Sequence, residues 1–236
     1  MKGTALITGG AKRIGKEIVR FLASKGYKVA IHCNTSMDEA IKLKEEINKD
    51  NLICEIFKCD LSNENELFSL IPKVIDKFSD LNVLINNASV FQRINFLKTE
   101  IDIFNHIFNV NFKAPYFLSQ NFAKVCKEGQ IINIVDSKVA HNDIAYAIYT
   151  LSKKSLAELT KISAKELAPS IRVNAIGPGY ILPPDKESKE YLIKRPDKIP
   201  LKRKGEIHEI IKSIDFLMEN LFVTGQIIFT DGGEHL

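Results

Sequence analysis

Three side chains that can hold or transfer a proton, Asp136, Tyr149 and Lys153, lie close together in the chain. The phenol and the ammonium group are four residues apart, so on a helix both project from one face and act on one small volume. A lysine beside a phenol favours the phenolate, which brings a group with a pKa near ~10 closer to working pH. A carboxyl added to this pair indicates proton chemistry on a nitrogen-rich ring more than on a plain ketone.

Short apolar segments alternate with longer amphipathic ones, which indicates a mostly parallel sheet with helices on both faces. We predict strands at Thr4–Thr8, Lys28–Cys33, Ile53–Lys58, Leu81–Asn86, Gln130–Asp136, Ile171–Ala175 and Gln226–Thr230. We predict helices at Ile14–Ser24, Met37–Asn48, Glu64–Phe78, Glu100–Cys126, Ala145–Leu167 and Glu206–Glu219. The expected fold is α/β: one Rossmann-type domain over residues 1–236, with a doubly wound parallel sheet of about seven strands.

Size and composition are those of one globular domain. The chain has 236 residues, of which 45% are hydrophobic and 26% charged. Its net charge of +4 is too small to indicate nucleic acid by itself. No apolar run reaches ~18 residues, the N-terminus shows no signal-peptide pattern, and the four cysteines show no metal-ligand spacing. We therefore expect a cytoplasmic protein with reduced thiols, no bound metal, and no nucleic-acid or membrane partner.

A glycine-rich turn, Thr8-Gly-Gly-Ala-Lys-Arg-Ile-Gly15, follows the first predicted strand. A turn at this place lets backbone amides and the helix N-terminus approach a pyrophosphate. The spacing differs from the common G-x-G-x-x-G, because Arg13 stands where the middle glycine would be. A tight turn without a ligand is the alternative, but the position directly after strand one favours a dinucleotide site.

The end of the second predicted strand bears on the choice between NAD and NADP. NAD-binding proteins place Asp or Glu there to hold the ribose 2′-hydroxyl. Here Asn34, Thr35 and Ser36 supply hydrogen-bond donors for a 2′-phosphate and Lys12 can add charge, so NADPH is favoured. Asp60, after the third strand, can accept from the adenine amino group. The alternative is an ordinary polar loop with helix caps.

The order of these motifs resembles the short-chain dehydrogenase/reductase family over essentially the whole chain. The matching motifs are Thr8–Gly15, Asn86-Asn-Ala-Ser89, Asn111, Tyr149 with Lys153, Pro178-Gly179, and Thr224-Gly225 followed by Asp231-Gly-Gly233. The resemblance implies that Tyr149 is the catalytic acid and that Lys153 holds the nicotinamide ribose and lowers the tyrosine pKa. It also implies that Asn111 supports a proton-relay water, and that the protein is a homotetramer. Two long helices could form the subunit contacts.

Within that family, Arg13, Phe91, Asp136 and Gly177-Pro-Gly179 resemble the pteridine reductases and the related bacterial dihydromonapterin reductases. Asp136 stands where the family usually has serine. The resemblance implies that the aromatic ring of Phe91 covers a flat pterin. It further implies that Ser89 and Arg13 contact the substrate and the cofactor phosphate.

These patterns and the resemblance together define the expected site. The expected cofactor-binding residues are Thr8, Gly9, Lys12, Arg13, Ile14, Gly15, Asn34, Thr35, Ser36, Asp60, Leu61, Asn87, Ala88, Lys153, Pro178 and Gly179. The expected substrate-binding residues are Arg13, Ser89, Phe91, Asp136, Tyr149 and Gly179, and the expected catalytic residues are Asp136, Tyr149, Lys153 and Asn111. The predicted reaction is hydride transfer from NADPH to a carbon–nitrogen double bond of dihydropterin, dihydromonapterin or dihydrofolate.

We expect Asp136 to lie beside Tyr149 at the carboxyl end of strand five. Desolvation by the pterin and the nicotinamide would raise the pKa of this carboxyl, which could then donate a proton or bind the guanidine-like edge of the pterin. Lys153 favours the ionised form, so the two groups can titrate as a coupled set. The structural alternatives for Asp136 are a helix cap or a salt bridge with Lys138. Strand alternation aims Ser137 away from Tyr149.

Other residues receive weaker assignments. Residues at about 180–205, which include four prolines and a basic cluster between Lys186 and Lys204, are predicted to form a substrate lid. The charges of this lid either attract a folate tail or stay solvated. Tyr146 is expected to be a pocket wall. The histidines, expected to lie at the surface or fill the core, are His32, His106, His141, His208 and His235. The alternative functions are a carbonyl reductase such as 3-oxoacyl-[acyl-carrier-protein] reductase, and a non-catalytic NADP-sensing protein.

Overall fold

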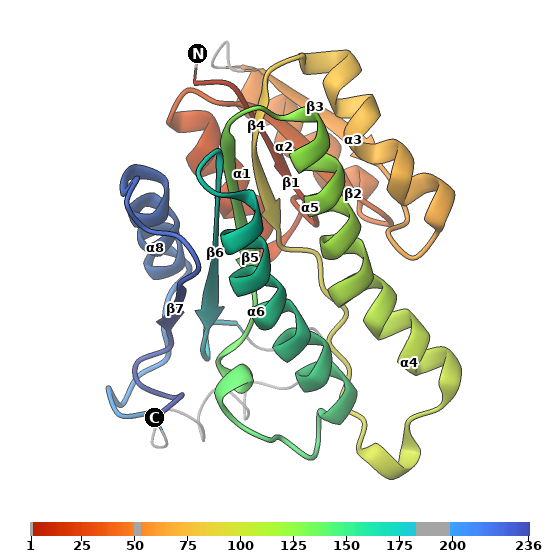
Figure 1. Ribbon diagram of the computed structural model, residues 1–236, viewed down its shortest axis with the longest axis vertical. Coiled ribbons are helices and arrows are strands. Elements are labelled where there is room, and N and C mark those ends of the chain that lie inside the picture. Colours follow the sequence, from red (N-terminus) through yellow and green to blue (C-terminus); the bar gives the residue numbers. More distant parts are fainter. Residues whose placement is uncertain (1, 50–52, 183–198) are drawn as a thin grey trace.

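A seven-stranded parallel sheet forms the centre of the computed structural model, which describes residues 2–49, 53–182 and 199–236 (Figure 1). The strands are β1 (Thr4–Ile7), β2 (Lys28–Cys33), β3 (Cys54–Lys58), β4 (Leu81–Asn86), β5 (Gly129–Ile134), β6 (Ile171–Pro178) and β7 (Ile227–Thr230). Their order is β3-β2-β1-β4-β5-β6-β7, and neighbouring strands are parallel throughout. The winding reverses between β1 and β4, the place where open α/β sheets bind ligands.

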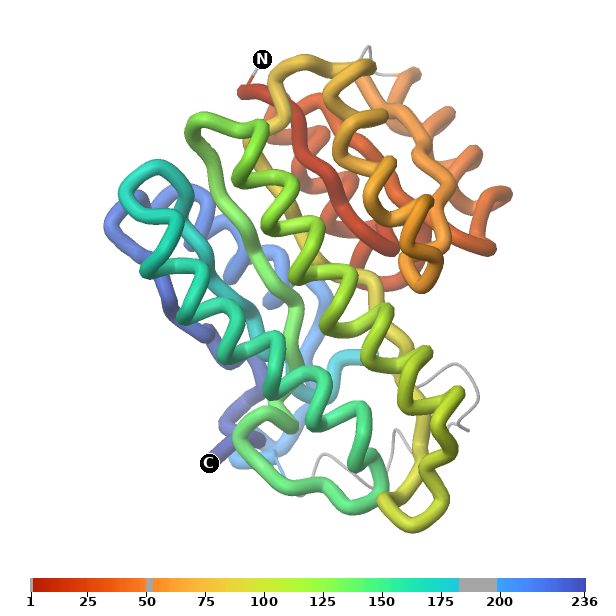
Figure 2. The backbone as a smooth tube through the Cα atoms, turned by 45° about the vertical axis from the view of Figure 1, so that its right-hand side comes forward, coloured from red at the N-terminus to blue at the C-terminus, as the bar shows by residue number. Residues whose placement is uncertain are grey.

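Helices cover both faces of this sheet. They are α1 (Arg13–Ser24), α2 (Met37–Asn48), α3 (Glu64–Phe78), α4 (Ile101–Phe108), α5 (Ala114–Val125), α6 (Ala147–Leu167) and α8 (Ile207–Glu219). One core joins the sheet to α1, α2 and α8, and a second joins its other face to α3, α5 and α6 (Figure 1, Figure 2). Because both faces are covered, β1 is buried at all four positions, and its residues Ala5–Ile7 are apolar without alternation. The predicted doubly wound Rossmann-type domain is confirmed.

The single helix predicted at Glu100–Cys126 is wrong, because the segment is divided into α4, a π-helical turn at Asn109–Lys113, and α5. Pro115 has no N–H to donate to the carbonyl of Asn111, so the regular i to i−4 ladder is interrupted where α5 begins. Turns of this type often occur at functional sites. The interruption turns Asn111 inward, and its side chain is fully buried.

The predicted strand Gln130–Asp136 also ends early. β5 stops at Ile134, and Asp136 is the N-cap of a short 3-10 helix, Ser137–Ala140. In the other direction, β6 continues beyond its predicted end to Pro178. Most of the predicted lid, residues 183–198, lies outside the described residues. None of the helices in the described part of the chain is long and apolar enough to cross a membrane.

The segments that follow β4, β5 and β6 all leave the sheet at one end, the lower end in Figure 1, where the C-terminus also lies. The N-terminus lies at the opposite end. Since all strands are parallel, their carboxyl ends meet at this edge and bring together residues far apart in the sequence. The edge is therefore the place at which the expected site residues can converge.

His32 ties two turns together at this edge. Its ring is 2% exposed, Nδ1 accepts a hydrogen bond from the Gly9 amide at 3.0 Å, and Nε2 lies 2.9 Å from the Cys59 carbonyl oxygen. Because Nδ1 is an acceptor, the proton of the neutral ring is on Nε2 and is donated to Cys59. Burial lowers the pKa of His32 to about 4. The ring is thus a buried crosslink between the β1–α1 and β3–α3 connections and does more than fill the core.

This crosslink predicts an acid-sensitive component of stability. The unfolded chain binds a proton near pH 6.5 that the folded chain excludes until about pH 4. The stability from neutral His32 is therefore complete above pH 6.5 and is lost as the pH falls toward 4, by on the order of 3 kcal/mol. Urea unfolding across this range is expected to show a steeper loss in the wild type than in His32→Gln, whose amide does not titrate. Equal slopes would contradict the assignment.

Candidate active site

A cavity of about 1190 Å³ opens at the carboxyl ends of the strands. Its wall is built from the glycine turn, the segments that follow β2 to β6, and the C-terminal segment. Every residue predicted to bind cofactor or substrate lines this cavity except Thr8, and every predicted catalytic residue lines it except Asn111. The tertiary structure therefore brings nearly the whole expected set into one space.

The glycine turn is closed from below by the end of β4. Gly9 has a φ of +62°, and a Cβ on Gly15 would stand 2.2 Å from the Gly9 carbonyl oxygen, so neither position accepts a side chain without a shift. The Asn87 side-chain amide donates to the carbonyl oxygens of Thr8 and Gly9 at 2.9 and 3.1 Å. Thr8 Oγ1 accepts from the backbone amides of Asn87 and Ala88 at 2.9 and 3.0 Å. Thr8 thus supports the turn from beneath instead of lining the cavity.

The polar residues after β2 and β3 surround the next part of the cavity, where Asn34, Thr35 and Ser36 all line it. Lys12 lines it as well, and its Nζ lies 2.7 Å from a carboxylate oxygen of Glu39. Asp60 accepts hydrogen bonds from the amide and hydroxyl of Ser62, which lower the pKa of its carboxyl. Asp60 therefore caps the turn after β3 while it faces the cavity.

Asp136 and Tyr149 share a hydrogen bond in the cavity wall. Tyr149 Oη donates to Asp136 Oδ2 at 2.7 Å, and the Lys138 amide donates to Asp136 Oδ1 at 2.9 Å. The carboxyl thus caps the 3-10 helix with one oxygen and holds the phenol with the other. The alternative salt bridge between Asp136 and Lys138 is wrong, because Lys138 Nζ pairs with Asp143 at 2.6 Å.

The pKa of Tyr149 differs from the sequence-based expectation. Burial, together with the charge and the hydrogen bond of Asp136, raises the pKa of the phenol well above 10, while a hydrogen bond with Ser89 lowers it. Lys153 was expected to lower this pKa, but its Nζ lies 6.0 Å from the ring centroid and donates to the Ile134 carbonyl at 2.8 Å. Burial is the largest cause and the nearer carboxyl adds to it, so the phenol keeps its proton.

The pKa values of Asp136 and Lys153 shift in the directions that desolvation predicts. Burial raises the pKa of Asp136, opposed by the Lys138 amide, the Tyr149 hydroxyl and the charges of Lys138 and Lys153. Burial lowers the pKa of Lys153 to about 8, and the charge of Asp136 opposes this change. Each group is therefore shifted toward its neutral form. Together they can retain a proton at the cavity wall near neutral pH.

Phe91 lies between two tyrosines. Its ring stacks on Tyr146 with centroids 4.6 Å apart and planes 22° apart, and it meets Tyr149 edge-on at 4.7 Å. Lys138 Nζ lies 4.9 Å from the Tyr146 ring centroid. Tyr146 lines the cavity, as expected for a pocket wall. Phe91 is 39% exposed, so it offers a fixed aromatic surface next to the phenol that holds the proton.

Asn111 acts on the site from behind. Its Oδ1 accepts from the Val90 amide at 2.8 Å, and its Nδ2 donates to the Val90 carbonyl at 3.0 Å and to Ser152 Oγ at 3.1 Å. Both amide hydrogens are used by these protein partners. The structure thus gives Asn111 the task of fixing the segment that carries Ser89 and Phe91.

Several cavity-lining residues were missed as site residues, among them His32 and Glu234. His32 stands two residues before Asn34, in the run used for cofactor preference, but nothing in the sequence showed that both of its nitrogens would be engaged. Glu234 directly follows the Asp231-Gly-Gly233 motif. Only the folding of the C-terminal segment toward β5 places its carboxyl in the cavity.

Comparison with known proteins agrees with this geometry. Residues 9–235 match the family model described as enoyl-(acyl carrier protein) reductase. The chain is 29% identical over 247 residues to the 3-oxoacyl-[acyl-carrier-protein] reductase FabG of Staphylococcus epidermidis, with 100% of both chains covered.

Solved structures show the same likeness. FolM alternative dihydrofolate reductase 1 of Brucella suis, in complex with NADP, is 36% identical with a TM-score of 0.94, over 99% of this chain and 95% of that one. A Serratia marcescens short-chain dehydrogenase/reductase mutant is 27% identical with a TM-score of 0.91, over 99% of this chain and 98% of that one. The chain belongs to the short-chain dehydrogenase/reductase family.

Proposed function

We propose that the protein is an NADPH-dependent reductase that converts a reduced pterin (dihydropterin, dihydromonapterin or dihydrofolate) to its tetrahydro form. The observation that carries the proposal is the 2.7 Å hydrogen bond between Tyr149 and Asp136 in the cavity wall. It places a carboxyl of raised pKa beside the phenol, next to the Phe91 ring. The likeness to FolM of Brucella suis supports the same substrate class.

The residues of the cavity fit a dinucleotide cofactor. Gly9 and Gly15 keep the turn free of side chains where a pyrophosphate would approach the start of α1. The run Asn34–Ser36 offers donors to a 2′-phosphate without a carboxylate at that place. Lys153 and Asn87 would hold the ribose end. NADP and NADPH stand in solved structures of similar proteins, which supports the same cofactor here.

The chain's own residues would supply the proton and the orientation. NADPH, when bound, supplies a hydride to the carbon of the carbon–nitrogen double bond. The Asp136–Tyr149 pair holds a proton whose loss is opposed by burial, and it would release that proton to the adjacent ring nitrogen. Phe91, fixed between Tyr146 and Tyr149, would cover one face of the flat ring. A ketone has no ring nitrogen for such an acid.

The 3-oxoacyl-[acyl-carrier-protein] reductase activity is the second candidate, because FabG of Staphylococcus epidermidis matches the full chain. The two reactions differ in the atom that receives the proton, which is nitrogen in a pterin and oxygen in a ketone. An assay of NADPH oxidation with dihydropterins, dihydrofolate and an acetoacetyl thioester in parallel separates them. Faster turnover of the thioester than of every pterin would contradict the proposed function.

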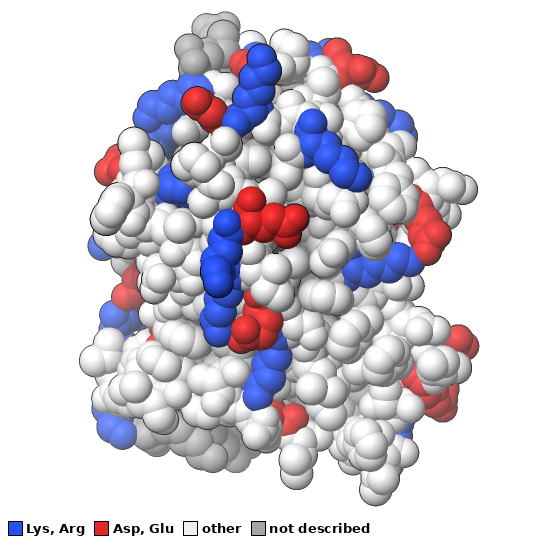
Figure 3. All heavy atoms as spheres, viewed as in Figure 1, with Lys and Arg blue, Asp and Glu red and all other residues white. Residues whose placement is uncertain are grey.

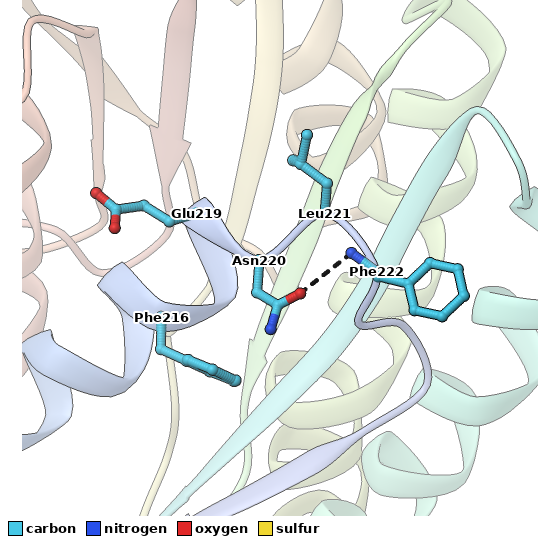
Figure 4. Close-up of a pocket in the computed structure, with 5 residues that line it drawn as sticks. All are labelled: Phe216, Glu219, Asn220, Leu221 and Phe222. Atoms are coloured by element: carbon cyan, nitrogen blue, oxygen red, sulfur yellow. Dashed lines mark hydrogen bonds between the residues drawn. The ribbon is translucent and has the colours of Figure 1, made fainter.

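We also propose a homotetramer, supported by two separate exposed apolar surfaces. From α4 through the π-helical turn to α5, the aromatic side chains Phe104, Phe108, Phe112 and Tyr116 follow one another with centroids 4.9 to 6.2 Å apart. Neighbouring α6 exposes Leu151 and Ile162, and uncharged surface lies on both sides of the column of charged side chains that runs down this face (Figure 3). The second surface lies at the end of α8, where Phe216, Leu221 and Phe222 border a shallow hollow (Figure 4). Two distinct surfaces suffice for a closed tetramer.

A cytoplasmic location is proposed as well. All four cysteines are free and buried, which fits an environment that keeps thiols reduced. Burial raises the pKa of the Cys54 and Cys59 thiols to about 12, so both remain unreactive near neutral pH.

Replacing Asp136 tests the proton donor. Asp136→Asn keeps the size of the side chain and one of its two acceptor oxygens. It removes the acid, so kcat for a dihydropterin is expected to fall ~10²- to 10⁴-fold. Asp136→Ser is expected to lose pterin reduction to a similar extent while keeping ketone reduction. Both are measured by NADPH oxidation, with the KM for NADPH as a control for folding. Full pterin activity in both variants would show that Asp136 has no such role.

The raised pKa of Asp136 predicts the shape of the pH profile. The acid form is the proton donor, and burial keeps it populated at a higher pH than a carboxyl with the ordinary pKa of 3.8. The kcat for a dihydropterin is therefore expected to fall as the pH rises through the raised pKa. The comparison with Asp136→Asn isolates this step, since Lys153 titrates in both proteins. The same alkaline decline in both proteins would rule out the carboxyl as its source.

The assembly is tested at the second apolar surface. Phe222 is fully exposed in the single chain, so Phe222→Glu places a charge in the proposed interface and is expected to convert tetramers to dimers. Ile41→Glu, at another exposed apolar position on α2, is the matched control and is expected to stay tetrameric. Sedimentation velocity gives the masses. A wild-type monomer, or an unchanged Phe222→Glu tetramer, would refute the arrangement.

A further inference from the structure

Arg93 places a positive charge in the wall of the cavity. Its side chain is exposed, and within the described residues the guanidinium has no ion pair, hydrogen bond or aromatic ring as a partner. Other cations of the same wall are engaged, because Lys138 Nζ lies 2.6 Å from Asp143 and Lys153 Nζ donates to a backbone carbonyl at 2.8 Å. The charge of Arg93 is therefore available to a ligand in the cavity.

The backbone that carries Arg93 is held on both sides. Before it, the Asn111 side chain accepts from the Val90 amide at 2.8 Å and donates to the Val90 carbonyl at 3.0 Å. After it, Ile94 forms an isolated parallel bridge with Tyr146. The guanidinium thus extends from a fixed point of the wall, which reduces the ordering that binding requires.

The proposed chemistry indicates where a side chain of the substrate leaves the pterin ring. In a dihydropterin, the carbon that receives the hydride also bears the side chain, and it is bonded to the nitrogen that takes the proton. The side chain therefore begins beside Tyr149. Phe91 meets Tyr149 edge-on with centroids 4.7 Å apart, and Arg93 follows two residues later, at most about 7 Å farther along the backbone. A side chain longer than the ring can extend from Tyr149 past Phe91 to the Arg93 guanidinium.

We propose that Arg93 binds a carboxylate on the side chain of the substrate and thereby favours dihydrofolate over dihydromonapterin. This inference rests on the function proposed above and deepens it, because it names the substrate class as reduced pterins with an anionic side chain. Dihydrofolate ends in carboxylates, whereas the side chain of dihydromonapterin is neutral. The planar guanidinium can donate two parallel N–H groups to one carboxylate.

The test compares Arg93→Gln with the wild type on dihydrofolate, on its dimethyl ester, which has the same side chain without charge, and on dihydromonapterin. Loss of an exposed charge-assisted contact is expected to raise the KM for dihydrofolate about 3- to 10-fold. The KM values for the dimethyl ester, dihydromonapterin and NADPH are expected to be unchanged. In the wild type, the KM for dihydrofolate is expected to be lower than that for the ester.

Ionic strength gives a second measurement that a merely structural role of Arg93 would not affect. Salt screens an attraction between exposed charges, with a Debye length of about 10 Å at 0.1 M. With NADPH saturating, the KM of the wild type for dihydrofolate is expected to rise with added salt. This rise is expected to be smaller in Arg93→Gln and absent for dihydromonapterin in both proteins.

Lys98→Gln is the matched control, because it removes the same charge from an exposed position on the same loop that does not line the cavity. Its KM values are expected to equal those of the wild type. Arg93→Lys keeps the charge but loses the planar pair of N–H groups. It is expected to give a KM for dihydrofolate between those of the wild type and Arg93→Gln.

The outcomes separate this inference from the proposed function. If the wild type reduces dihydromonapterin and Arg93→Gln keeps the wild-type KM for dihydrofolate, the inference is overturned and the proposed function stands. The same holds if the wild type reduces dihydromonapterin but not dihydrofolate. An equal rise in KM for dihydrofolate and its dimethyl ester also overturns the inference, because recognition of the charge requires the two to differ. A wild type that reduces none of the three compounds overturns both.

Discussion

The hydrogen bond from Tyr149 to Asp136 is the interaction around which the site is arranged. Burial disfavours the charged form of each group. The charge of Asp136 raises the pKa of Tyr149 further, while the hydrogen bond from Tyr149 lowers the pKa of Asp136. A proton shared in this way is retained near neutral pH without a strong base. The charge of Lys153, whose own pKa is lowered to about 8, limits the rise in the pKa of Asp136 but does not reverse it. The chemistry of the cavity thus follows from desolvation more than from any single charge.

Several side chains hold the loops around the cavity in place, and two of them, Thr8 and Asn111, do not line it. Thr8 and Asn87 hold the glycine turn against the end of β4, and His32 joins that turn to the end of β3. Asn111 fixes the segment that carries Ser89 and Phe91. Each satisfies backbone groups that would otherwise be buried without partners. The loops around the cavity are therefore held by hydrogen bonds from the layer behind them.

Fold and family leave the substrate open, because the same sheet carries different chemistries in FolM of Brucella suis and FabG of Staphylococcus epidermidis. In this chain, carboxyls follow the ends of β5 and β7, at positions 136 and 234, and both line the cavity. The function proposed here makes Asp136 the proton donor. A carboxylic acid at that place suits a flat ring with nitrogen acceptors better than a plain ketone.

The sequence by itself determined the sheet and most helix boundaries, and nearly all of the site residues that it predicted line the cavity. Strand and helix periodicities are local, and motifs placed after parallel strands must meet at one edge. It did not determine the break at Asn109–Lys113, where Pro115 interrupts a pattern that reads as one helix. It also gave the wrong direction for the pKa of Tyr149, because that direction depends first on the burial of the phenol and then on its contact with Asp136. The position of Glu234 depended on the C-terminal segment folding across β5, a contact between residues 97 positions apart. Only the tertiary structure decides such distances.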